Sequence, residues 1–119
     1  MAWQFDNTKP IYIQLVEELK LQIISGAIPI GSKLASVRDM AEEAGVNPNT
    51  MQRALAELER ENLVFSQRTT GRFVTEDEDL VRQLRRTFAV EKISELTATL
   101  LQIGYTKNEL IELINTCLN

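Results

Sequence analysis

The sequence predicts a mainly α-helical protein in which three helices, a β-hairpin and two further helices follow one another. Three observations predict this fold class. Apolar residues recur at helical spacing in five segments, a short glycine-containing turn separates the second segment from the third, and two β-prone runs flank a polar segment that holds one glycine. The length of 119 residues allows one domain of ordinary size, or a small domain with an appendage.

The first helix is predicted over residues 9–25. Its apolar residues recur at steps of three and four and define one face: Tyr12, Leu15, Val16, Leu19 and Ile23. We expect Asn7 or Thr8 to cap its start and Gly26 to provide the left-handed backbone that ends it. Residues 27–33 contain a proline and a glycine, and they are predicted to form a short extended connector.

Two helices joined by a tight turn are predicted next. Ser36 is expected to cap the second helix and Gly45 to end it, and Asn47 is expected to cap a third helix whose first turn contains Pro48. The third helix turns Met51, Ala54, Leu55 and Leu58 inward. Its other faces carry Asn49, Thr50, Gln52, Arg53 and Ala56, so the outer face is polar and uncommitted to packing.

The hairpin is predicted from strands at residues 63–65 and 72–74, with a polar segment between them. Residues 62–75 hold two arginines and no acid, so the hairpin tip is locally basic. Thr75 is expected to cap a fourth helix through a capping box with Glu78, and Thr106 is expected to cap a fifth.

The last two helices form a tail that is too apolar for one small domain to cover. We therefore expect two copies of the chain to bury the apolar faces of these helices against each other in a homodimer. The residues expected at this dimer interface are Leu84, Phe88, Ile93, Leu96, Leu100 and Ile103. The predicted boundaries are residues 1–75 for the first domain and residues 76–119 for the helical dimerisation tail.

Composition excludes most catalytic chemistry. The chain has no histidine and one cysteine, which removes the usual zinc sets, Cys–His nucleophile pairs and imidazole acid–base catalysis. We expect no enzyme, no metal site and no cofactor. The amino end has no basic segment followed by an apolar core, and no apolar run is long enough to span a membrane, so we expect a cytoplasmic protein without a membrane partner.

Three helices followed by a basic-tipped hairpin form a winged helix-turn-helix, in which the third helix can enter the major groove of double-stranded DNA. Because the net charge is −4, such binding must come from a local patch. Asn49 and Gln52 can offer the donor and acceptor pair that matches adenine, and Arg38 and Arg53 can reach phosphates or guanine. The capped starts of the second and third helices attract phosphate.

Two stretches, Leu34–Ala41 and Gly45–Leu55, resemble the GntR family of bacterial transcription regulators. The resemblance continues through the wing and covers roughly residues 10–75, and linked motifs of this kind are more specific than a lone helix-turn-helix. The step Asn47–Thr50 and the short tail are similar to the YtrA branch of the family. The resemblance implies a dimeric repressor that reads a palindromic operator, with the third helix in the major groove and the wing tip at the minor groove.

Motif position then implies which residues contact DNA. The groove and phosphate contacts are Arg38, Asn47, Asn49, Thr50, Gln52 and Arg53, the wing tip is Thr70 and Gly71, and Ser36, Arg68 and Arg72 complete the predicted set. The sequence departs from the family at Ala35, where proline is usual, and at Thr69, where glycine is frequent. Gln52 stands where many relatives have arginine, which changes the side chain offered to the bases.

Several residues have a second interpretation. Arg38 and Arg53 can pair with the acids four residues later, and the wing arginines can protect a hairpin edge from aggregation. Trp3, Phe5 and Tyr12 are expected to pack on the core or the dimer partner, and Cys117 is expected to be a small buried hydrophobe.

A competing function is a winged-helix module that binds a protein. A small-molecule effector of unknown identity would bind at the dimer interface.

Overall fold

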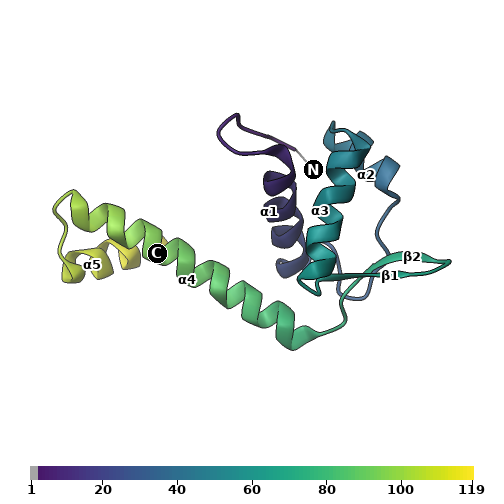
Figure 1. Cartoon of the computed structure of the whole chain (residues 1–119). Helices are drawn as coiled ribbons and strands as arrows, with labels where there is room; N and C mark the ends of the chain where they lie inside the picture. Colours follow the sequence, from purple (N-terminus) through teal and green to yellow (C-terminus); the bar gives the residue numbers. More distant parts are fainter. Residues whose placement is uncertain (1–2) are drawn as a thin grey trace. The chain divides into compact units, whose positions relative to one another are not determined.

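The computed structural model describes residues 3–119 and has the predicted order of elements (Figure 1). The elements are α1 (Ile11–Ile24), α2 (Val37–Ala44), α3 (Pro48–Arg60), β1 (Val64–Gln67), β2 (Gly71–Val74), α4 (Glu78–Gln102) and α5 (Lys107–Leu118). This confirms the mainly helical fold with one small hairpin. The chain divides into two compact units, one ending at Arg82 and the other spanning Gln83–Asn119.

The core of the first unit is built around α3. Figure 1 shows α1 and α3 side by side with α2 beside α3, and both helices pack on α3. The four residues predicted to point inward from α3 are buried as expected: Met51, Ala54, Leu55 and Leu58. The main residues of α1 that close the core are Leu15, Leu19 and Ile23. Because the inner face of α3 is fully used in packing, its other face remains available to solvent.

The ends of α2 and the start of α3 follow the sequence prediction. The Asp39 N–H donates to Ser36 Oγ (3.1 Å), and the Asn49 N–H donates to Asn47 Oδ1 (2.7 Å). Gly45 ends α2 with a φ of 72°, in the left-handed region that favours glycine. These caps fix a tight turn between α2 and α3, which is the turn that a helix-turn-helix requires.

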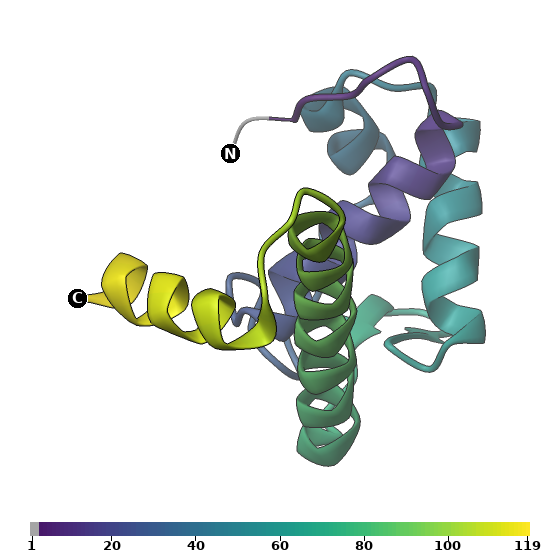
Figure 2. The same ribbon diagram turned by 90° about the vertical axis from the view of Figure 1, so that its left-hand side faces the viewer.

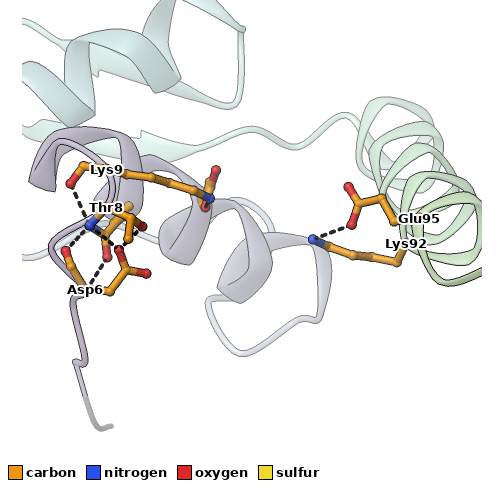
Figure 3. Close-up of polar contacts among 7 residues, drawn as sticks. Asp6, Thr8, Lys9, Lys92 and Glu95 are labelled. Atoms are coloured by element: carbon orange, nitrogen blue, oxygen red, sulfur yellow. Dashed lines mark hydrogen bonds and ion pairs between the residues drawn. The ribbon is translucent and has the colours of Figure 1, made fainter. Parts of the chain in front are cut away.

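The predicted cap of α1 is wrong. Pro10 occupies the N-cap position, and no side chain caps the helix there. Asn7 and Thr8 lie in a turn that precedes the helix, so they are not placed to cap it. In that turn the Thr8 N–H donates to Asp6 Oδ1 (2.9 Å), as Figure 3 shows. The Gln14 amide donates to the backbone carbonyls of Asp6 and Lys9 (both 2.9 Å) and so holds the turn to the first turns of the helix.

The wing is longer than predicted and has an additional neighbour. β1 and β2 pair antiparallel with Val64 opposite Val74 and Gln67 opposite Gly71, so the turn is only residues 68–70. The connector after α1 pairs with the other side of β2 through an antiparallel bridge between Lys33 and Phe73. Its backbone donates from Leu34 to the Arg72 carbonyl, and Val74 donates to the Ser32 carbonyl (both 2.9 Å). The connector therefore covers an edge of the hairpin.

A carboxylate of α3 holds the wing in place. Arg72 Nε and Ser66 Oγ both donate to Glu59 Oε1, at 2.8 and 2.6 Å. The hydrogen bonds from Ser66 and then from Arg72 lower the pKa of Glu59 and outweigh the opposing effect of burial. An ionised Glu59 thus adds a side-chain link between α3 and the hairpin to the buried contacts of Val64 and Val74.

The predicted capping box at Thr75 is also wrong, because α4 begins at Glu78, two residues later than a helix capped by Thr75 would begin. The backbone of Thr75 is still bonded to the core, where its N–H donates to the Leu63 carbonyl (2.9 Å) and its side chain is buried. The Thr75 Oγ1 accepts from the Asp77 N–H (3.0 Å), and Asp77 Oδ1 accepts from the Leu80 N–H (3.1 Å). Asp77 therefore supplies the cap.

The second unit contains most of α4 and all of α5, which follow one another across a short turn (Figure 2). The Thr106 capping box with Glu109 is formed as predicted, and Lys92 pairs with Glu95 along α4 (3.6 Å, Figure 3).

The expectation that Cys117 is buried is wrong. Cys117 is exposed, because it lies on an uncovered face of α5. Across residues 3–119, no helix has the length and apolar character needed to cross a membrane.

The core can be tested with two matched substitutions in the first unit. Ile23 is 1% exposed and Ile30 is 37% exposed. We expect Ile23→Ala to lower the free energy of unfolding by about 2–5 kcal/mol, because it leaves a cavity, and Ile30→Ala to lower it by less than about 1 kcal/mol. Urea denaturation at equal protein concentration measures both, and equal losses would contradict the described core.

The anchoring of the wing predicts a pH dependence. Because the folded pKa of Glu59 is lowered, its stabilising effect is complete above the pKa of the unfolded chain and is lost as the pH falls through the folded pKa. The Arg72 Nε–H resonance in NMR spectra should shift over that acidic range. The same resonance in Glu59→Gln should not follow this titration, and an unchanged titration in that variant would show that Glu59 does not hold Arg72.

Candidate nucleic-acid interface

The outer face of α3 presents the polar side chains that the sequence predicts for base recognition. Asn49, Gln52 and Arg53 are exposed and Thr50 is partly exposed. Within residues 3–119, the side chains of Asn49 and Gln52 make no intramolecular hydrogen bond, so their donors and acceptors are free for a ligand. An amide with both groups free can pair with an adenine edge in the major groove.

The residues that cap the starts of α2 and α3 are both exposed. Ser36 and Asn47 each accept a backbone N–H of their own helix, so their side-chain oxygens are engaged in capping. The other first-turn N–H groups and the positive end of each helix dipole can still attract a phosphate. Arg38, in the first turn of α2, is exposed, and no ion pair with Glu42 forms among the described residues.

Arg53 has a neighbour that the sequence did not reveal. Its guanidinium lies over the ring of Tyr12, 3.6 Å from the ring centroid, in a cation–π contact between α3 and α1. The alternative partner, Glu57, is hydrogen-bonded to Arg60 instead, and this bond lowers the pKa of Glu57. The helical spacing of Arg53 and Glu57 suggested a local pair, whereas Tyr12 is distant in sequence and gave no such signal.

The wing tip presents Arg68, Thr70 and Gly71 to solvent. Gly71 has a φ of 113°, and a Cβ there would lie 3.1 Å from Lys33 Cε, so a glycine suits this position for two reasons. Arg72 is different, because its guanidinium is half-buried and paired with Glu59. Neither interpretation from the sequence, DNA contact or edge protection, identified Glu59 as its partner.

A groove of about 650 Å³ brings the wing and the start of α2 together. It is lined by residues 33–37 from the connector and α2 and by residues 66–72 from the wing. Ser36, Arg68, Thr70, Gly71 and Arg72 from the predicted DNA-binding set therefore border one hollow. A basic hollow beside a helix start can accept an anionic backbone.

Comparison with known proteins supports this interpretation. The family described as "Bacterial regulatory proteins, gntR family" matches residues 11–74. The chain is 35% identical over 113 residues to the uncharacterised HTH-type transcriptional regulator YhcF of Bacillus subtilis, covering 95% of this chain and 93% of YhcF. It is 37% identical over 71 residues to the transcriptional repressor YtrA of the same organism, covering 60% of this chain and 55% of YtrA.

Solved structures agree with these sequence relatives. A GntR family transcriptional regulator from Listeria monocytogenes superposes with a TM-score of 0.88 at 36% identity, covering 94% of this chain and 98% of that one. The AraR DNA-binding domain in complex with operator ORX1 superposes with a TM-score of 0.55 at 25% identity, covering 63% and 90%. The family and these relatives are transcriptional regulators and not enzymes, in agreement with the sequence prediction.

The family match covers more than half of the chain, and the relative YhcF is similar over nearly all of it. This chain therefore belongs to the GntR family of bacterial regulatory proteins, and it is a DNA-binding transcriptional regulator.

Proposed function

We propose that the protein is a dimeric repressor that binds a palindromic operator, with α3 in the major groove and the wing at the minor groove. The observation that carries this proposal is the division of α3 into a fully buried inner face and an outer face with free amide groups. A helix held in this way can present base-reading side chains without losing its packing. The similarity to the repressor YtrA and to the operator-bound AraR domain supports the same function.

In this proposal, DNA recognition belongs to residues 1–75. Asn49, Thr50, Gln52 and Arg53 read base edges, while Arg38 and the starts of α2 and α3 bind phosphates. Arg68, Thr70 and Gly71 place the wing tip at the minor groove. The net charge of −4 fits specific binding by this local surface rather than indiscriminate coating of DNA.

Dimerisation belongs to residues 76–119 in this proposal. The tail exposes several large apolar side chains to solvent, among them Ile93, Leu96 (57% exposed), Ile103 (67% exposed), Ile111, Ile114 and Leu118. Leu84, Phe88 and Leu100 are partly exposed along the same helix. Exposed apolar surface of this kind is typical of a protein interface. A two-fold dimer would present two copies of α3 to two symmetric half-sites, and this is why the operator should be palindromic.

Base reading and phosphate binding can be separated with two variants. We expect Gln52→Ala to weaken operator binding by about 1–3 kcal/mol and to relax specificity at one base pair. Arg38→Ala should instead weaken binding to all sequences and reduce the slope of log affinity against log salt concentration by about 1. Fluorescence anisotropy on a duplex selected by the wild-type protein from random DNA measures both effects.

The control for Arg38→Ala is Lys107→Ala, which removes an exposed positive charge from the start of α5. Binding by this control should match the wild type. The proposal fails if the wild-type protein shows no preference for the selected duplex over random DNA, or if its binding does not weaken with salt.

The proposed dimer interface can be tested with two substitutions on α4, each of which replaces an apolar residue with aspartate. Leu96→Asp should disrupt the dimer, because it introduces a charge into the buried stripe. Ala98→Asp is the matched control, because Ala98 is exposed and lies about 200° around the helix from Leu96. Light scattering at micromolar concentration should give half the wild-type mass for Leu96→Asp and the wild-type mass for Ala98→Asp. A monomeric wild type, or a dimeric Leu96→Asp, would refute this interface.

A further inference from the structure

We propose that Tyr12 of α1 is a positioning residue for DNA recognition, because its ring holds the guanidinium of Arg53 in place at the outer face of α3. The inference rests on the proposed operator binding. The two groups are 3.6 Å apart, measured from Arg53 Cζ to the ring centroid, well within the reach of a cation–π contact. Tyr12 would thereby make a residue outside the recognition helix part of the recognition surface.

The contact with Tyr12 leaves the hydrogen-bonding groups of Arg53 free, because no hydrogen bond from its guanidinium forms among residues 3–119. A guanidinium is planar, and its five N–H donors point outward in that plane. The face of an aromatic ring attracts the charge but offers no oxygen or nitrogen acceptor, so the contact does not use up these donors. Arg60 and Arg72 behave differently, because the donors of each bind a carboxylate, Glu57 and Glu59 respectively. Within residues 3–119, Arg53 has no acidic partner within ion-pair distance.

The donors of Arg53 are therefore available to an acceptor from outside the chain. Its side chain is exposed, and it follows directly after Gln52, whose amide is free. Guanine O6 and N7 or the oxygens of a DNA phosphate present acceptors that a guanidinium edge can bind in a bidentate manner. An acidic side chain in the place of Tyr12 would bind the N–H donors of Arg53 and compete with DNA for them. The Tyr12 ring does not compete in this way.

Tyr12 can hold Arg53 because it is itself fixed. It is half-buried in the first turn of α1, and the following residues Leu15 and Val16 are buried against the rest of the first unit. An unsupported arginine side chain loses conformational entropy when it is ordered on DNA. A ring that orders the side chain before binding reduces this loss, so removal of the ring should weaken operator binding without removing any DNA contact.

The test compares Tyr12→Leu, which removes the ring, with Tyr12→Phe, which keeps it. Binding is measured by anisotropy on the duplex that the wild-type protein selects from random DNA, and thermal denaturation verifies that each variant is folded. We expect Tyr12→Leu to weaken binding by about 3- to 30-fold and Tyr12→Phe to change it by less than about 2-fold. In an Arg53→Ala background, Tyr12→Leu should cause no further loss. The Arg53 Nε–H in the free protein should become more mobile in ¹⁵N relaxation for Tyr12→Leu only.

The outcomes separate this inference from the proposed function. If Arg53→Ala weakens binding but Tyr12→Leu does not, the positioning role is overturned and the repressor proposal stands. If Tyr12→Leu causes the same loss with and without Arg53, Tyr12 acts through the stability of α1, and the positioning role is also overturned. If the wild-type protein selects no duplex at all, the proposed function fails and the inference fails with it.

Discussion

The packing of the inner face of α3 is the constraint on which the rest of the structure depends. Met51, Ala54, Leu55 and Leu58 are fully buried, and α1 and α2 both pack on the helix that carries them. This arrangement fixes the rotation of α3 about its own axis. The polar residues between the buried ones are consequently held at the surface, where a DNA-binding protein needs them.

Much of the fold could be predicted because its signals are local. The Ser36 and Asn47 caps, the left-handed Gly45 and the inward face of α3 all follow from residue type and spacing within a single helix. The predictions at the starts of α1 and α4 were wrong because the expected capping residues make bonds outside the helix. The Thr75 N–H donates to the Leu63 carbonyl and the Thr75 carbonyl accepts from the Gly31 N–H, so neither backbone group is left for the predicted capping box and first helical turn.

The composition of the candidate interface could also be predicted, but its internal partners could not. The exposure of Asn49, Gln52 and Arg38 follows from the periodicity of α2 and α3. The partners of Arg53 and Arg72 come from other elements of the fold: Tyr12 takes the place of the alternative partner Glu57 for Arg53, and Glu59 is a partner for Arg72 that spacing did not suggest. Periodicity identifies the face that a side chain occupies, whereas the tertiary arrangement determines its neighbour.

The link between α3 and the wing at Glu59 has a consequence for the DNA itself. Ser66 and Arg72 share Glu59 Oε1, and this link, together with the buried Val64 and Val74, joins the helix and the hairpin into one bracket. In the proposed complex, such a bracket fits one separation between a major groove and the adjacent minor groove. Duplexes with another minor-groove width must deform to match it, and the energy of that deformation depends on base steps that the protein never touches. DNA stiffness would then contribute to the choice of operator alongside direct base contacts.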